Sequence, residues 1–476
     1  MKSIWADSVF YFFTILIHRA INFCLVFFYV SNLSPDEYGT FELFISICTF
    51  LAVFIGLELY QGCGRLFSEV TDLEKNTIFS MCFFTILLCS FVFILANYLG
   101  LFSNLWKYIF ETRDLSSMTL AGALHICAFS LFAFLQIQLK WEFRRIAFLL
   151  ATATPILIYL LIVIYFIFFS TLTIEILVWG NFFLNILGCS LCIIMLRHRF
   201  CLNFNFNLYK QVFSFSLPLI PSGILLIAIL ISDRLMLDWL LERSDVGEYS
   251  FGYRVANIAV FAYAGIQSAL APLVMKSLSN ENFLDDFSRV FHIFLFYSHI
   301  FIFGLLIFIP SIISNIVDIS IYQYTFSLII FLVPALFLSQ MYIFFPGPVI
   351  AKKNEIYLLV NFVSLIINLC ANLFFIPLFG VIGAALATFL TYAINILLLA
   401  FLTRQIFLPR IDKAFLSALS LCWLVIFFAW FEPSIKIYDQ SIIYKLSLYL
   451  FLAIFVVRYS KLPFSVLTNN LRKWIN

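Results

Sequence analysis

Long apolar runs separated by short polar breaks fill this sequence, and they leave few folds open to it. A run of roughly 18–20 apolar residues is the length that crosses a bilayer as a helix. We therefore predict an all-α integral membrane protein with about 14 transmembrane helices. The predicted ranges are 8–31, 41–61, 78–100, 117–138, 146–169, 174–196, 212–237, 247–275, 290–310, 325–350, 356–376, 380–403, 414–431 and 441–457.

The composition excludes a soluble globular protein. The chain is 64% hydrophobic and 11% charged, whereas soluble domains are about 45–50% apolar and about 25% charged. All polar breaks between the runs are short, so no stretch is long enough for a soluble catalytic domain. We do not predict an enzyme.

The sequence carries no recognisable motif for metal, cofactor or nucleotide chemistry. Cys189 and Cys192 form a CxxC, but it lies inside an apolar run with no second Cys/His pair nearby. The sequence has no Walker motif and no HExxH, and the GxG at Gly62–Gly64 follows no strand. We therefore predict no catalytic residue, no metal, no cofactor and no nucleic-acid partner.

Basic residues follow a strong alternation between successive breaks. If the N-terminus is cytoplasmic, about twenty Lys and Arg fall on the inner side and about five on the outer side. Lys and Arg are retained on the cytoplasmic side during insertion. The pattern predicts that both termini are cytoplasmic and that the number of spans is even.

A short motif suggests an internal repeat. SPDEYGTFEL (34–43) follows the first predicted span, and SDVGEYSFGY (244–253) follows the seventh. Two halves of six spans in the same orientation would form a parallel repeat, although a chance match explains so short a motif equally well. We predict two pseudo-symmetric six-helix bundles, 1–211 and 212–403, followed by two additional C-terminal helices and a cytoplasmic tail in 404–476.

Charged residues inside the apolar runs are the strongest functional signal. A charge at a helix centre costs at least about 2.5–3.5 kcal/mol on insertion scales. Arg19 lies near the middle of the first span, Asp233 and Arg234 lie in the outer third of the seventh, and Arg254 lies about two turns below the outer surface. Two structural alternatives remain open: Arg234 snorkels to the interface, or Asp233 and Arg254 form an ion pair that only joins two helices.

The predicted membrane inventory is more cationic than anionic, because Arg19, Arg234 and Arg254 outnumber Glu58 and Asp233. A cavity lined in this way attracts an anion. Arginine suits phosphate, since its planar guanidinium makes two parallel hydrogen bonds and stays charged.

Ion coupling would need groups that change protonation. Four residues in the apolar runs qualify as candidates: Asp233, Glu58, His292 and His299. The two histidines are seven residues apart, so they share one face of a helix.

Several stretches resemble the Wzx-type O-antigen and polysaccharide flippases, a family within the superfamily of lipid II flippases and MATE exporters. They are LSPDEYGTFELF (33–44), residues 214–258 with SLPLIP, SDRLML and VGEYS, QSALAPLVMKSL (267–278) and IPLFGVIGAALATFLTY (376–392). The resemblance implies a two-lobed MATE-like helical transporter in a bacterial inner membrane.

The resemblance also implies a substrate and a cycle. The protein would move an undecaprenyl-diphosphate-linked oligosaccharide, an O-antigen or capsule repeat unit, from the cytoplasmic to the periplasmic leaflet by ion-gradient-driven alternating access. Arg19, Arg254 and Arg234 would bind the diphosphate. Membrane lipids, and other membrane proteins of polysaccharide assembly, are the further partners it suggests. The alternative is a MATE-type cation or drug exporter, which would favour an acidic cavity.

Overall fold

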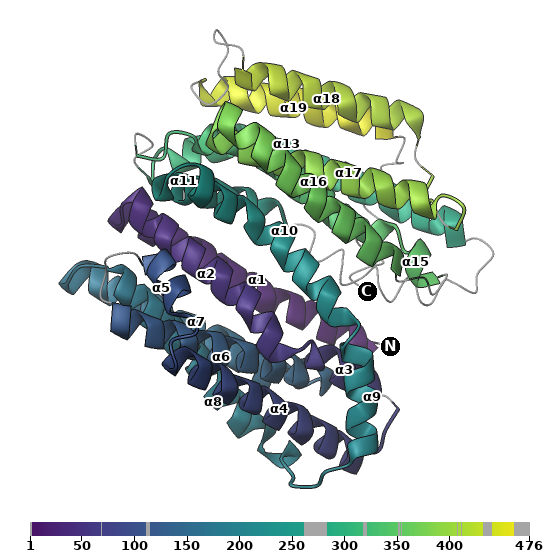
Figure 1. Ribbon diagram of the computed structural model, residues 1–476. Coiled ribbons are helices and arrows are strands. Elements are labelled where there is room, and N and C mark those ends of the chain that lie inside the picture. Colours follow the sequence, from purple (N-terminus) through teal and green to yellow (C-terminus); the bar gives the residue numbers. More distant parts are fainter. Residues whose placement is uncertain are drawn as a thin grey trace. The chain divides into compact units, whose positions relative to one another are not determined.

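The computed structural model is helical throughout the spans that it describes (Figure 1). The described residues are 2–67, 69–110, 115–260, 283–317, 321–350, 353, 355–406, 408–410, 412–431 and 440–460. The motif at 267–278, the break at 432–439 and the predicted cytoplasmic tail beyond Ser460 lie outside the described residues.

The first half of the chain contributes eleven α-helices and a short 3-10 helix. They are α1 (Lys2–Asn32), α2 (Pro35–Gly56), α3 (Leu59–Leu66), α4 (Asp72–Tyr98), α5 (Ser103–Phe110), α6 (Leu115–Trp141), α7 (Arg145–Phe169), α8 (Ile174–Leu196), η1 (Arg197–Arg199), α9 (Phe206–Ser216), α10 (Leu219–Leu240) and α11 (Arg243–Ala256).

The described part of the second half is equally helical. Its elements are α13 (Phe283–Ile313), α14 (Thr325–Gln340), η2 (Met341–Phe344), α15 (Gly347–Ile350), α16 (Glu355–Phe379), α17 (Val381–Thr403), α18 (Lys413–Phe431) and α19 (Ile442–Ser460).

Thirteen helical segments in the described residues are long and apolar enough to cross a membrane. Each matches one of the predicted spans, and the two C-terminal ones, α18 and α19, are among them. The remaining predicted span, 247–275, begins within α11 and continues into residues that are not described. The predicted fold class, an all-α multi-pass membrane protein, is confirmed.

The chain forms two compact units. One comprises Met1–Arg254 and Asn361–Ala387, and the other comprises Val255–Val360 and Thr388–Asn476. In the first unit α6 packs against α8 and α2, α1 against α7, and α2 against α10. In the second unit α19 packs against α13 and α18. The lobe boundaries at 211 and 403 were predicted from the sequence repeat, whereas these units are defined by their internal contacts. The predicted boundaries therefore stay a prediction.

The order of the helices repeats with the offset of the sequence motif. Glu37 and Glu248 are 211 residues apart, and so are the first residues of α4 and α13, Asp72 and Phe283. The first residues of α6 and α14 are 210 apart, as are those of α7 and α16. The described spans of the two halves therefore follow one another at similar intervals, as a parallel repeat would produce, and the division into two six-span halves stays a prediction.

Local signals explain where α2 begins and ends. Ser34 and Glu37 form a capping box, with Pro35 at the first helical position, so the helix starts there and not at residue 41 as predicted. It ends at Gly56, because Leu57 and Glu58 both adopt left-handed backbone angles, with φ of 48° and 53°. The predicted second span, 41–61, is therefore wrong at both ends.

Candidate functional site

A buried carboxylate that the sequence analysis overlooked organises the charged residues of the first unit. Glu42 lies on α2 about two turns from its start, and its side chain is only 3% exposed. Arg254 on α11 donates from Nε to Oε1 at 3.0 Å and from Nη2 to Oε2 at 3.2 Å. Tyr38 donates its hydroxyl to the same carboxylate at 3.0 Å. Glu42 was overlooked because the span was predicted to start at 41, which placed this residue at the membrane edge.

Arg234 on α10 is a third residue that lies close to the carboxylate of Glu42, after Arg254 and Tyr38. Its Nε lies 3.7 Å from Oε2 of Glu42 and donates to Oγ of Ser250 at 3.0 Å. Its guanidinium carbon lies 4.8 Å from the ring centroid of Tyr253, within the range of a cation–π contact. Because Arg234 is 6% exposed and held by these groups, the snorkelling alternative is wrong.

Asp233, next to Arg234 in sequence, belongs to a separate set of hydrogen bonds. Tyr249 donates to its carboxylate at 2.6 Å, Asn372 at 2.8 Å and Asn368 at 3.2 Å. The two asparagines come from α16, so the set joins α10, α11 and α16. The ion pair that Arg254 makes in the structure is with Glu42, which corrects the predicted alternative in which Asp233 was its partner.

The formal charges of this group balance. Arg234 and Arg254 are accompanied by Glu42 and Asp233, and all except Arg254 are buried. Glu42 was not among the charged residues compared in the prediction, and with it the predicted set has three arginines and three carboxylates. The side chain of Arg254 remains 35% exposed. It has the largest exposed fraction of the four charged side chains.

Two glycines bring the helices close enough for these contacts. A Cβ atom on Gly39 would lie 2.1 Å from the carbonyl oxygen of Arg243, and one on Gly247 would lie 2.1 Å from that of Pro35. Backbone therefore touches backbone where α2 crosses α11. Both glycines belong to the repeated motif, so the motif marks a contact between its own two copies.

Arg243 secures the same crossing to α5. It forms an ion pair with Asp238 at the end of α10, and it donates to the carbonyl oxygens of Ile109 and Tyr108 at 2.7 Å and 3.1 Å. A cation at the last carbonyls of a helix is favourable, because it satisfies acceptors without intrahelical partners. Arg243 lies in the polar break between the predicted spans 212–237 and 247–275, and no role was predicted for it.

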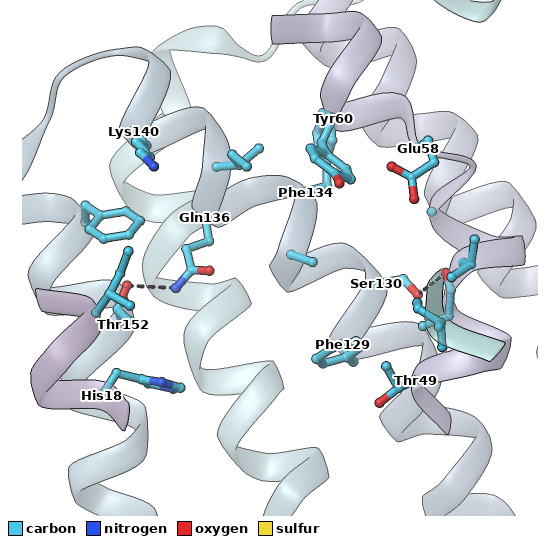
Figure 2. Close-up of a pocket in the computed structure, with 18 residues that line it drawn as sticks. His18, Thr49, Glu58, Tyr60, Phe129, Ser130, Phe134, Gln136, Lys140 and Thr152 are labelled. Atoms are coloured by element: carbon cyan, nitrogen blue, oxygen red, sulfur yellow. Dashed lines mark hydrogen bonds between the residues drawn. The ribbon is translucent and has the colours of Figure 1, made fainter. Parts of the chain in front are cut away.

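A cavity of about 520 Å³ lies between α1, α2, α6, α7 and α10 of the first unit (Figure 2). Glu58 and Lys140 line one end of it, where α2 and α6 terminate on the predicted cytoplasmic side, and His18 lies at the other end. Its hydroxyl, amide and aromatic lining residues include Thr49, Tyr60, Phe129, Ser130, Phe134, Gln136, Phe148 and Thr152.

Glu58 stands at the break after α2 and faces this cavity. Its carboxylate accepts a hydrogen bond from Nε2 of Gln61 at 2.8 Å, and its backbone carbonyl accepts one from Ser216 at 3.2 Å. A non-glycine residue in the left-handed region costs on the order of 1–3 kcal/mol and is found mainly at functional sites. The structure thus places Glu58 outside a regular membrane helix, in a strained turn between α2 and α3.

Arg19 follows the cavity residue His18 on α1 and is half-buried. It is not one of the residues that line this cavity. Its predicted role in binding a diphosphate stays a prediction.

His292 and His299 share a face of α13, as their spacing predicts, because both rings contact α18. His292 stacks on Phe415 at 4.2 Å and its Nε2 lies 2.9 Å from the carbonyl oxygen of Ser460. His299 is buried, with Nδ1 2.7 Å from the carbonyl oxygen of Leu295 and its ring 6.2 Å from that of Trp423. Both belong to the second unit, and their predicted coupling role stays a prediction.

Comparisons with known proteins agree on the architecture. The family described as "Polysaccharide biosynthesis protein" matches residues 4–278. A structure of the lipid II flippase MurJ in an inward closed conformation has 16% sequence identity and a TM-score of 0.70, and the match covers 98% of this chain and 99% of that one. The search of curated proteins found no match.

Two transporters of the MOP superfamily show the same fold. An inward-facing multidrug resistance MATE transporter matches at 12% identity with a TM-score of 0.66, over 82% of this chain and 95% of that one. A MOP superfamily transporter from Pyrococcus furiosus, whose binding pocket is described as having reversed polarity, matches at 12% with a TM-score of 0.60, over 84% and 96%.

Proposed function

Because the chain belongs to the polysaccharide biosynthesis protein family, we propose that it is a flippase for an undecaprenyl-diphosphate-linked oligosaccharide. The carried unit would be an O-antigen or capsule repeat. It would move from the cytoplasmic to the periplasmic leaflet of a bacterial inner membrane, with both termini of the protein in the cytoplasm. The lipid II flippase that shares this fold supports the proposal at the level of architecture.

The physical need for such a protein comes from the sugars. Each hydroxyl costs about 4–8 kcal/mol to move into hydrocarbon when no hydrogen bond replaces those made to water. A cavity inside the membrane helices lowers that barrier if its walls offer polar groups and aromatic faces. The cavity of the first unit offers both, with Gln136 and Thr152 on one wall and Phe129 and Phe134 on another (Figure 2).

One observation carries the assignment of an anionic substrate: the guanidinium of Arg254 is held in bidentate geometry within membrane helices and is still 35% exposed. The same fork fits a phosphate. We propose that Arg254 contacts the diphosphate first, with Arg234 behind it and Arg19 as a further contact on α1.

Transport against a gradient requires an ion that binds differently in the two conformations. Asp233 is the candidate with the most specific surroundings, because two asparagine amides and a tyrosine hydroxyl converge on its carboxylate. Glu58, His292 and His299 are the other candidates that we propose. Transport in vesicles with an imposed pH gradient tests all four, and an unchanged rate would remove them together.

The function is tested by deleting the gene in its host and identifying the lipid-linked glycan that accumulates on the cytoplasmic face. Complementation with Arg254→Ala should leave surface polysaccharide absent, whereas Arg65→Ala, which removes an exposed arginine paired with Glu69, should restore it. Both proteins must reach the membrane in equal amounts. Normal polysaccharide with Arg254→Ala would contradict the proposed binding role. Increased drug susceptibility with normal polysaccharide in the deletion strain would instead support the MATE-type exporter.

A further inference from the structure

Glu42 binds Arg254 in the geometry that arginine uses for phosphate. The Nε and Nη2 atoms of Arg254 donate to the two carboxylate oxygens of Glu42, at 3.0 Å and 3.2 Å. Arginine forms the same parallel pair of hydrogen bonds with carboxylate and with phosphate. The nitrogen atoms proposed to hold a diphosphate are therefore already occupied by a group of the protein itself.

The two partners differ in how far they can be reached. Glu42 is 3% exposed, whereas Arg254 is 35% exposed. An anion entering the bundle would meet the arginine while the carboxylate lies behind it. The carboxylate also reaches a second arginine, Arg234, whose Nε is 3.7 Å away and which is itself buried.

We infer that Glu42 is an internal counter-ion that occupies the anion-binding groups of Arg254 and Arg234 until a diphosphate displaces it, an inference that rests on the proposed function. Without the carboxylate, the buried Arg234 and the half-buried Arg254 would repel each other, and an unpaired buried charge is strongly destabilising. The carboxylate thus keeps the site folded when no substrate is bound.

Displacement leaves Glu42 with a hydrogen-bond donor. Tyr38 lies one turn before Glu42 on α2, is fully buried and donates to Oε1 at 3.0 Å. This contact lies within one helix, so it persists when the ion pair with Arg254 is broken. A diphosphate carries at least two negative charges, so it can replace one carboxylate on two arginines. Loss of the ion pair between α2 and α11 would then accompany substrate binding, while the backbone contact at Gly39 and Gly247 is kept.

The test measures binding of farnesyl diphosphate to the purified full-length protein in detergent. Glu42→Gln keeps the shape of the side chain and removes the competing charge, so we expect its affinity to rise about tenfold over wild type. Arg254→Ala should abolish binding, and Glu42→Gln combined with Arg254→Ala should behave like Arg254→Ala alone. Glu69→Gln neutralises an exposed carboxylate outside the cluster and should match wild type.

Two results would overturn the inference. One is wild-type or weaker affinity in a Glu42→Gln protein that melts as wild type does. The other is an affinity equal to that of wild type in a second variant, Glu42→Asp. The shorter side chain of this variant loosens the contact with Arg254, so we expect its affinity to lie between those of wild type and Glu42→Gln. If neither wild type nor any variant binds farnesyl diphosphate, the proposed substrate is contradicted as well. This result differs from one in which wild type binds and Glu42→Gln binds no better, which contradicts only the counter-ion role of Glu42.

A phospholipid headgroup presents similar phosphate chemistry, so the source of the anion needs its own comparison. The same proteins are titrated with inorganic pyrophosphate and with phosphatidylglycerol nanodiscs as competitors of farnesyl diphosphate. We expect pyrophosphate to compete and phosphatidylglycerol not to, because a diphosphate offers charge to both arginines. Full competition by phosphatidylglycerol would assign the arginines to membrane lipid and overturn the inference.

Discussion

The charged cluster around Glu42 and the cavity that contains Glu58 lie in the same compact unit, yet they are built in opposite ways. In the cluster, Glu42, Arg234 and Arg254 are brought together where the backbones of α2 and α11 touch, and the carboxylate pairs with both arginines. In the cavity, Glu58, Lys140 and His18 are spread around a space of about 520 Å³. A charged residue in an apolar run can therefore have a structural role and a functional role at the same time. The residues that line a cavity, in contrast, come from several helices and cannot be recognised from their positions in the sequence.

The largest effect is expected at the helix crossing that supports the cluster. Gly39→Ala would place a Cβ atom 2.1 Å from a backbone oxygen, so α2 and α11 must separate and the ion pairs must break. We expect little folded protein after detergent extraction, measured by fluorescence-detected size exclusion. Gly56→Ala is the matched control, because nothing lies within 4 Å of a Cβ there.

A second prediction compares the two carboxylates directly. Glu42→Ala leaves Arg234 and Arg254 without their shared carboxylate, and loss of one partner of a buried ion pair costs about 3–5 kcal/mol. Glu58→Ala removes a half-buried group whose carboxylate accepts a hydrogen bond from Gln61, and it should cost about 1 kcal/mol. Thermal unfolding in detergent measures both. Equal melting temperatures for the two variants would show that the cluster and the cavity do not differ as described.

The strained turn at the edge of the cavity gives a smaller effect of opposite sign. Leu57 has a φ of 48°, and glycine adopts that conformation without steric penalty. Leu57→Gly is therefore expected to raise stability by up to about 1 kcal/mol, less what is lost in side-chain packing. Ile55→Gly, at a buried position within α2, should lower stability. A loss of stability in Leu57→Gly as large as that in Ile55→Gly would refute the strain.

The smallest change in stability is expected at the cavity wall. Lys140 is exposed and lines the cavity, and surface substitutions usually stay within about 0.5 kcal/mol. We expect Lys140→Ala to melt as wild type does but to lower the amount of surface polysaccharide in complemented cells. Lys210→Ala removes an exposed lysine of α9 outside the cavity and should leave polysaccharide unchanged. Equal polysaccharide in both variants would argue against a transport role for the cavity.

Much of the fold could be predicted from hydropathy alone, because length and apolarity determine which segments cross a membrane. Thirteen predicted spans correspond to helices of the structure. The start of α2 was missed although its signal is present, since Ser34 and Glu37 have the spacing of a capping box. The end of α2 carries no such signal, because the left-handed turn at Leu57 and Glu58 has neither glycine nor asparagine.

The site was predicted less well, for a physical reason. The sequence marks Asp233, Arg234 and Arg254 as costly in hydrocarbon, but it does not say which helices face each other. The contact of Glu42 with Arg254 spans 212 residues, and those of Asp233 with Asn368 and Asn372 span 135 and 139. Such pairings depend on helix packing. An uncharged asparagine such as Asn368 or Asn372 does not stand out in an apolar run, so its contact with Asp233 could not be predicted.

The glycine crossing of α2 and α11 has a consequence for how the protein could diversify. Main-chain contacts at Gly39 and Gly247 determine how closely those two helices approach each other. Side chains elsewhere along α2 and α11 are not needed to set this spacing. If the chain carries a glycan as proposed, the side chains that line its path can vary in chemistry and adapt to a different glycan, while the spacing of α2 and α11 is kept.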